Sequence, residues 1–259
     1  MNTYGLIGYP LGHSFSRKFF TEKFEQEGID AQYLNFEIPN IEEFPNIIQN
    51  NPELRGLNVT IPYKQQVMQY LDEISEEAKA IGAVNVIAPR PPKGEGCRDA
   101  AQMRLVGYNS DVIGFVESIK PLLKPHHKKA LILGTGGASK AIRYGLEKKL
   151  GMETLYVSRT AREGMITYED VTAEVLKKYE VIVNCSPVGM YPHVDECPAL
   201  PYEAMNENNL LYDLVYNPLE TLFMKKGAAQ GATVKNGLEM LHLQAIASWE
   251  FWGGEEKKK

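Results

Sequence analysis

The chain has 259 residues, of which 44% are hydrophobic and 24% charged, a composition typical of a folded globular protein. Its formal net charge of −5 at pH 7 argues against a nucleic-acid-binding protein, and no apolar run approaches the length of a membrane span. The three cysteines, Cys97, Cys185 and Cys197, form no Cys-x-x-Cys pair, which argues against a disulfide framework and a zinc site. The first residues contain no basic region followed by an apolar segment, so we expect no secretory signal and a cytoplasmic location.

Alternating strand and helix patterns predict an α/β protein, and the length favours two domains. In the first half, the pattern predicts strand 4–9, a helix from about 16, strand 32–38, helix 41–49, strand 56–60, a helix to about 81, strand 82–87, a strand ending near 108 and helix 112–123. Segment 89–103 is rich in proline, glycine and charge, so we expect an exposed loop or extended hairpin away from the active site.

Two serines flank the start of the first helix, just beyond the end of a strand. The hydroxyls of Ser14 and Ser16 could donate hydrogen bonds to a small anion such as a carboxylate. The alternative is that one serine only caps the helix, and spacing alone favours that alternative.

A second polar group follows strand 56–60. Asn58, Thr60 and Lys64 lie close together at a strand end, where open α/β sheets place their ligands, and Pro62 prevents the strand from continuing. Lys64 could equally be an ordinary surface lysine at the start of the next helix.

Two further polar residues occupy similar positions. Asn85 interrupts an apolar strand, where asparagine is disfavoured unless its amide has a task. Asp111 follows another strand and precedes a helix, a position at which a helix N-cap is the simpler interpretation.

A glycine-rich turn follows the apolar strand 130–133 and leads into a helical pattern. Gly134 and Gly136 fit the first two positions of the dinucleotide fingerprint, whereas Ser139 replaces the usual third glycine or alanine and Gly137 is an additional glycine. Such a turn can bring a pyrophosphate close to the N–H groups of a helix N-terminus. A tight turn that binds nothing is the alternative.

The end of the next strand, 154–157, bears on the choice of cofactor. Ser158, Arg159 and Thr160 stand where an acidic residue would hold the ribose of NAD. A guanidinium and two hydroxyls suit the 2′-phosphate of NADP instead, although Arg159 could be a solvated surface charge.

The rest of the chain continues the alternating pattern. We expect helix 168–178, strand 180–184 with a loop at 185–190, strand 210–215, helix 219–229, strand 233–235 and helix 238–251. Gln244 is a polar residue in this otherwise apolar last helix, and an exposed position would explain it equally well.

Seven of these segments, in this order, resemble the shikimate dehydrogenase family. They are SFS at 14–16, GLNVTIPYK at 56–64, IGAVN at 81–85, GYNSD at 107–111, GTGGAS at 134–139, NCSPVGM at 184–190 and GLEMLHLQA at 237–245. The resemblance implies an α/β substrate-binding domain at 1–112, completed by a C-terminal helix at 236–259. It also implies a Rossmann-like, doubly wound NADP-binding domain at 113–235, with the active site in the cleft between the domains.

The implied reaction is the reversible NADPH-dependent reduction of 3-dehydroshikimate to shikimate. By matching motif positions, the resemblance makes Lys64 and Asp111 the catalytic pair. It makes substrate contacts of Ser14, Ser16, Thr60, Asn85, Tyr216 and Gln244, supported by Asn58. It assigns the cofactor to Gly134, Thr135, Gly136, Gly137, Ala138, Ser139, Ser158, Arg159, Thr160 and the backbone near Leu214 and Gly237.

Some positions depart from the family pattern, and alternatives stay open. Val86 and Ser110 each replace a common threonine, and Ser158 replaces a frequent asparagine. The nearest rival is a quinate or dual quinate/shikimate dehydrogenase, and a more distant one is a folate-type dehydrogenase. A non-catalytic sensor of a dinucleotide and a cyclic acid is the rival of another class, disfavoured because it would need neither Lys64 nor Asp111. We expect a monomer or homodimer that binds small molecules and no metal.

Overall fold

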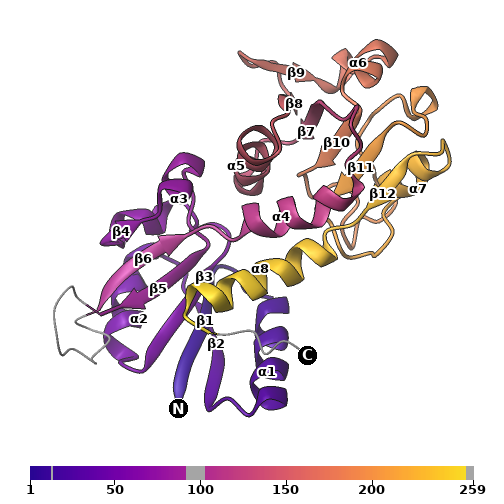
Figure 1. Cartoon of the computed structure of the whole chain (residues 1–259). Coiled ribbons are helices and arrows are strands. Elements are labelled where there is room, and N and C mark those ends of the chain that lie inside the picture. Colours follow the sequence, from indigo (N-terminus) through magenta and orange to yellow (C-terminus); the bar gives the residue numbers. More distant parts are fainter. Residues whose placement is uncertain (13, 92–102, 255–259) are drawn as a thin grey trace. The chain divides into compact units, whose positions relative to one another are not determined.

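The computed structural model describes residues 1–12, 14–91 and 103–254, and the chain forms two compact units. The first unit contains Met1–Ser110 and the C-terminal segment from Gln244, and the second contains Asp111–Leu243 (Figure 1). No helix in the described part of the chain is long and apolar enough to cross a membrane.

The first unit is built on a six-stranded sheet. Its order is β2 (Ala31–Glu37), β1 (Asn2–Gly8), β3 (Leu54–Val59), β5 (Val86–Arg90), β6 (Arg104–Tyr108) and β4 (Glu73–Ile74). The first three strands are parallel, and β5 is antiparallel to both of its neighbours. The helices of this unit are α1 (Phe15–Glu27), α2 (Phe44–Asn50), α3 (Glu76–Ile81) and most of α8 (Leu238–Phe251), with 3-10 helices η1 (Ile41–Glu43) and η2 (Gln66–Tyr70).

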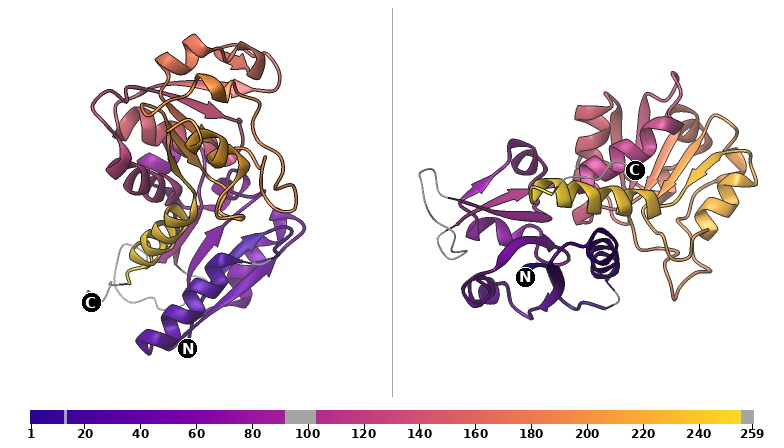
Figure 2. Two further views of the ribbon diagram at one scale, coloured as in Figure 1. Left: turned by 90° about the vertical axis from the view of Figure 1, so that its right-hand side faces the viewer. Right: turned by 60° about the horizontal axis from the view of Figure 1, so that its bottom comes forward.

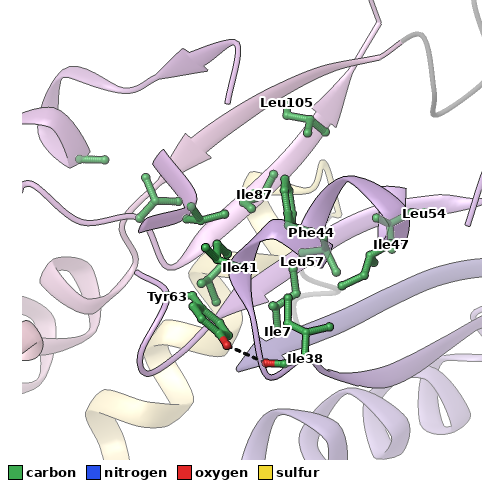
Figure 3. Close-up of a cluster of buried hydrophobic side chains, with 14 residues drawn as sticks. Ile7, Ile38, Ile41, Phe44, Ile47, Leu54, Leu57, Tyr63, Ile87 and Leu105 are labelled. Atoms are coloured by element: carbon green, nitrogen blue, oxygen red, sulfur yellow. Dashed lines mark hydrogen bonds between the residues drawn. The ribbon is translucent and has the colours of Figure 1, made fainter. Parts of the chain in front are cut away.

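Side-chain alternation along the strands gives this sheet two apolar faces. On one face, Ile7, Leu57 and Ile87 pack against α2 residues, including Phe44 (Figure 3). On the other face, the strand residues Tyr4, Leu6 and Val86 pack against α1 and α8. Phe20 of α1, Trp249 of α8 and Trp252, just after α8, belong to the same cluster. Helix α1 runs beside β2 (Figures 1 and 2). Side chains alternate between the two faces along β3, so residues 56 and 58 face the same side. A Cβ on Gly56 would meet Trp252, so the side chain of Asn58 lies on the face covered by α1 and α8.

The second unit has a parallel sheet of six strands. Their order is β12 (Thr233–Lys235), β11 (Leu210–Asp213), β10 (Val181–Asn184), β7 (Lys129–Leu133), β8 (Glu153–Ser158) and β9 (Met165–Thr167). This is the Rossmann order, and the direction of strand succession reverses between β7 and β10. The other elements are α4 (Asp111–Ile119), η4 (Lys120–Leu122), α5 (Gly137–Tyr144), the π-helix η5 (Gly145–Lys149), η6 (Tyr168–Asp170), α6 (Ala173–Lys178), η7 (Tyr202–Ala204) and α7 (Leu222–Ala228).

The predicted α/β architecture is confirmed, but the helix predicted up to about residue 81 is wrong. The strand predicted at 82–87 is wrong over most of its length, because β5 begins only at Val86. Instead of a helix to about residue 81, this segment contains η2, β4 and α3. Asp72 starts the short strand, because its N–H donates to the carbonyl of Leu105 at 3.0 Å and its carboxylate accepts from the Leu105 N–H at 2.7 Å. Ser75 then caps α3 by accepting from the N–H of Ala78 at 3.2 Å.

Segment 89–103, predicted to be an exposed loop or an extended hairpin, joins two paired strands. Strands β5 and β6 pair antiparallel as far as Arg90 and Arg104. The central part of the prediction, at 92–102, lies outside the described residues.

Candidate active site

The serines at the start of α1 have separate partners. Ser14 is the N-cap, and its Oγ accepts from the N–H of Arg17 at 3.1 Å. This bond occupies a lone pair and leaves the hydroxyl proton for another acceptor, so capping and anion binding are compatible. Ser16 lies beside Tyr33 of β2, where it opposes the rise in the Tyr33 pKa that burial causes.

The end of β3 is fixed by backbone and side-chain bonds. The N–H of Thr60 donates to Ile7 at 2.9 Å, and the N–H of Tyr63 donates back to Thr60 at 2.9 Å, which closes a turn. The Tyr63 hydroxyl donates to the carbonyl of Ile38 at 2.7 Å and anchors that turn in the core (Figure 3). Half-buried Lys64 comes directly after it, with its carbonyl accepting from Val84 at 2.7 Å. The turn therefore fixes the backbone that carries Thr60 and Lys64.

Polar side chains near the end of β3 form a hydrogen-bonded cluster. The amide of Asn58 accepts from Tyr33 at 2.8 Å and donates to Ser248 of α8 at 2.9 Å. Ser248 donates to the carbonyl of Gln244 at 2.8 Å, so the cluster connects β3 with the helix turn that carries Gln244.

Buried Asn85 extends the cluster to Ser110. Its Nδ2 donates to the hydroxyl of Ser110 at 3.1 Å, and its Oδ1 accepts from the Ser110 N–H at 2.7 Å. The two serine hydroxyls of Ser110 and Ser248 are 3.4 Å apart. Asp111, the residue after Ser110, is 4% exposed and begins α4. Hydrogen bonds thus connect Asn58, Asn85 and the backbone carbonyl of Gln244 within the first unit.

The glycine-rich turn follows β7 in the second unit. Gly134 has φ +96°, a conformation that suits glycine, and a Cβ there would lie 3.4 Å from Ser186 in the loop after β10. Gly136 is the N-cap of α5, and a Cβ on Gly136 or Gly137 would meet no atom within 4 Å. Thr135, Gly136 and Gly137 are exposed, and Ala138 is half-buried.

The departure at Ser139 has a structural explanation. Its hydroxyl donates to the carbonyl of Gly136 at 2.6 Å, so the Ser139 side chain stabilises the turn with a local hydrogen bond. The Tyr156 hydroxyl donates to the Ser139 carbonyl at 3.2 Å and ties the turn to β8. The exposed backbone N–H groups at the start of α5 fit a pyrophosphate.

The residues predicted to select NADP follow β8. Ser158 is buried and its hydroxyl accepts from the N–H of Thr160 at 3.4 Å. Arg159 is exposed, and its charge acts on Tyr168, where it opposes the rise in pKa that burial causes. Arg159 and Thr160 are both exposed at the carboxyl end of β8, where a ligand can reach them.

Sequence reasoning missed a buried polar cluster at the ends of β10 and β11. The Asp213 carboxylate accepts from Asn184 Nδ2 at 3.0 Å, from the Val215 N–H at 3.0 Å and from Thr221 Oγ1 at 2.6 Å. The other side of the Asn184 amide accepts from the Ser186 hydroxyl at 2.7 Å. Burial raises the pKa of Asp213 to about 6, although these donors oppose the rise. A lone aspartate at the end of an apolar strand was the signal that could have revealed it.

The remaining cofactor candidates lie beside this cluster. The N–H of Leu214 donates to the carbonyl of Asn184 at 3.0 Å. A Cβ on Gly237 would come within 2.2 Å of the Leu214 carbonyl oxygen, so only glycine permits this close approach. Tyr216 lies two residues after Leu214, and its side chain is 39% exposed. In the described part of the chain, no group of three or more His, Cys, Asp or Glu side chains could hold a metal ion.

Comparison with known proteins identifies the family. The sequence model of the shikimate dehydrogenase substrate binding domain matches residues 6–87. The shikimate dehydrogenase (NADP(+)) of Carboxydothermus hydrogenoformans is 37% identical, in an alignment that covers 96% of this chain and 91% of that protein. The chain belongs to the shikimate dehydrogenase family.

Solved structures of the family agree in fold over nearly the whole chain. Shikimate dehydrogenase 1 from Peptoclostridium difficile has 38% sequence identity and a TM-score of 0.78, covering 100% of this chain and 94% of that one. The enzyme from Thermus thermophilus, solved in complex with NADP(H) and shikimate, has 31% identity and a TM-score of 0.80, covering 97% and 93%. The matched family domain contains six of the candidate residues, namely Ser14, Ser16, Asn58, Thr60, Lys64 and Asn85.

Proposed function

We propose that this chain catalyses the reversible NADPH-dependent reduction of 3-dehydroshikimate to shikimate, a step in the synthesis of aromatic compounds. The observation that carries the proposal is the match, over 97% of the chain, to a relative solved with both NADP(H) and shikimate. The first unit is the proposed substrate-binding domain and the second the proposed NADP-binding domain. The proposal includes a cytoplasmic location and an assembly no larger than a homodimer.

In the proposed substrate site, the hydroxyls of Ser14 and Ser16 donate to the substrate carboxylate. The amides of Asn85 and Gln244 can both donate and accept, which suits them to sort the ring hydroxyls. Asn58 supports this group through its bonds to Tyr33 and Ser248. Thr60 and Tyr216 complete the proposed contacts.

In the proposed chemical step, Lys64 acts on the carbonyl oxygen of the substrate. Reduction of a ketone builds negative charge on that oxygen, and an ammonium group can both stabilise the charge and donate a proton. Asp111 accepts a hydrogen bond from a substrate hydroxyl and orients the ammonium group. The proton reaches the oxygen either from Lys64 directly or through water or Asp111.

Bound NADPH would supply the hydride. Residues 134–139 offer backbone N–H groups to its pyrophosphate, and the absence of protein atoms within 4 Å of an added Cβ at Gly136 and Gly137 gives space for that group. Ser158, Arg159 and Thr160 would hold the 2′-phosphate. The backbone of Leu214 and Gly237 would also contact the cofactor.

The test is an absorbance assay of nicotinamide reduction with shikimate or quinate, each paired with NADP⁺ or NAD⁺. We expect the largest kcat/KM with shikimate and NADP⁺. A preference for quinate or for NAD⁺ would replace the proposed substrate or cofactor. Silence in all four pairings from protein that still binds NADPH would indicate a sensor instead.

A further inference from the structure

The loop at 185–190 lies beside the glycine-rich turn of the second unit. It follows β10, and the turn follows β7, the neighbouring strand, at the point where the direction of strand succession reverses. In open α/β sheets, ligands bind beyond the carboxyl ends of the strands at such a point. A Cβ on Gly134 would lie 3.4 Å from the Cβ of Ser186, so the loop packs closely against the turn. The loop therefore borders the proposed pyrophosphate site.

The amide of Asn184 connects this loop to Asp213. Its Oδ1 accepts from the N–H of Ser186 at 3.1 Å and from the Ser186 hydroxyl at 2.7 Å. Its Nδ2 donates to Asp213 Oδ1 at 3.0 Å. A backbone N–H can only donate and a carboxylate can only accept, so the two partners allow one orientation of the amide. Asp213 thus turns the amide oxygen of Asn184 towards the loop.

The Asp213 carboxylate also holds two other segments. The same Oδ1 accepts from the N–H of Val215 at 3.0 Å, and Oδ2 accepts at 2.6 Å from the hydroxyl of Thr221, the N-cap of α7. Asn184, Asp213 and Thr221 are all 0% exposed. An apolar side chain would fill this place without the desolvation cost of a charge, so packing alone does not explain a carboxylate here.

We propose that Asp213 is a positioning residue for the cofactor, which holds the loop at 185–190 and the backbone at Val215 in the arrangement that binds NADPH. This inference rests on the proposed function, in which the second unit binds NADPH. The carbonyl of Val215 accepts from the N–H of Gly237 at 3.2 Å, so Asp213 also supports the backbone assigned to the cofactor near Leu214 and Gly237. Segments that are ordered before binding lose less conformational entropy when the ligand binds.

The test compares two substitutions of Asp213. We expect Asp213→Ala to raise the Kd for NADPH about tenfold, because the released segments must be ordered again on binding, and to change the KM for shikimate little at saturating NADP⁺. Asp213→Asn should restore the Kd to within about twofold, since its Oδ1 can accept from Asn184 and Val215 while the Thr221 hydroxyl accepts from its Nδ2. A Kd in Asp213→Ala equal to that of the unmodified protein would overturn the inference.

The matched control is Asn209→Ala, at the opposite end of β11. Asn209 is 2% exposed, directly precedes Leu210, and accepts from the N–H of Asn206 at 2.9 Å, so it also holds a loop from a buried position. We expect both alanine variants to lower the melting temperature but only Asp213→Ala to weaken NADPH binding. Equal increases in the Kd for NADPH would indicate a general loss of structure and would also overturn the inference.

Hydrogen exchange of the loop amides without cofactor measures the positioning directly. The N–H groups of Ser186 and Val188 donate to Asn184 Oδ1 and Ser186 Oγ. We expect these amides to exchange about tenfold faster in Asp213→Ala and at an unchanged rate in Asn209→Ala, because only the first variant releases the loop. Unchanged exchange in a folded Asp213→Ala would contradict the inference.

A variant on the half-buried loop keeps the test open if Asp213→Ala does not fold. Ser186→Ala removes the hydroxyl bond to Asn184, and we expect the same directions of change in loop exchange and in the Kd for NADPH. If neither quantity changes, the inference is wrong. If the unmodified protein does not bind NADPH, the proposed function itself fails, which is distinct from a protein that binds NADPH equally well with and without the Asp213 carboxylate.

Discussion

Two amide side chains of the candidate substrate site are held by neighbours in the same unit. Both sides of the Asn85 amide form hydrogen bonds with Ser110. The amide of Asn58 forms hydrogen bonds with Tyr33 and Ser248. A side chain that is already oriented loses less conformational entropy when it binds a ligand. Preorganisation of this kind favours selection among similar ring hydroxyls, where an unmatched polar group is costly.

Lys64 differs from these residues because its proposed role is chemical. We expect Lys64→Ala to lower kcat by about 10²–10⁴, the scale for loss of a positioned acid–base group, with little change in the Kd for NADPH. Steady-state kinetics and fluorescence titration of NADPH measure the two quantities. Lys79→Ala is the control, since Lys79 is an exposed lysine of the same unit that pairs with Glu76. An unaltered kcat in Lys64→Ala would remove this residue from the chemical step.

Arg159 bears on cofactor choice. We expect Arg159→Ala to weaken NADPH binding by roughly 10- to 100-fold, the usual value of a hydrogen bond to a charged group, and to leave NADH binding nearly unchanged. Calorimetric titration with each cofactor gives both affinities. Lys178→Ala, which removes another exposed cation of the second unit, controls for the change in net charge. Equal losses for the two cofactors would show that Arg159 does not distinguish the 2′-phosphate.

At the scale of elements, the sequence predicts best where periodicity and turn chemistry agree. The apolar positions of the last helix predicted 238–251, and α8 is Leu238–Phe251. The glycine-rich turn and its flanking strand and helix were also predicted correctly, because Gly134 and Gly136 interrupt an otherwise regular pattern.

Elements that depend on distant partners were not predictable in this way. Strand β4 has two residues and exists because it pairs with β6, about thirty positions along the chain, while the local apolar spacing resembles that of a helix. Strand β9 was also missed, because its three residues are too few to show a periodic pattern. The hydrogen bond between Tyr33 and Asn58 could not be predicted in this way, because the two residues are 25 positions apart in the chain.

The turn before α5 allows a test that separates ligand binding from folding. Gly136 has φ −72°, which other residues adopt, and an added Cβ would meet no protein atom within 4 Å. We therefore expect Gly136→Ala to keep the melting temperature within about 2 °C and to weaken NADPH binding at least tenfold, because the methyl group takes the space of the pyrophosphate. Gly12→Ala is the control, since its Cβ also meets nothing within 4 Å and lies in the first unit. Undiminished NADPH affinity in Gly136→Ala would contradict pyrophosphate binding at this turn.

At the scale of the whole molecule, the two units have separate cores. The first unit contains two clusters, one on each face of its sheet, and the second has its own cluster around Leu131, Ile182 and Phe223. Both tryptophans, Trp249 and Trp252, belong to the first unit. Tryptophan fluorescence therefore reports on the first unit, and the stability of the second needs a residue-specific measurement.

The buried Asp213 makes a prediction about the stability of the second unit. Its pKa is raised from 3.8 to about 6 by burial, so the folded state holds this proton more tightly than the unfolded state. The contribution of Asp213 to the free energy of unfolding of the second unit is therefore most stabilising below about pH 4. It falls as the pH rises to about 6, by at most about 1.4 kcal/mol per pH unit for one proton, and is constant above that.

Hydrogen exchange of the β10 and β11 amides, corrected for the intrinsic rate at each pH, measures this free energy from pH 4 to 7. In Asp213→Asn, which keeps the size of the side chain and cannot ionise, we expect the decline between pH 4 and 6 to be shallower than in the unmodified protein. The difference between the two proteins isolates Asp213 from the other carboxylates. Parallel pH profiles would mean that Asp213 has the same pKa in both states, and that its three donors fully offset the burial of its charge.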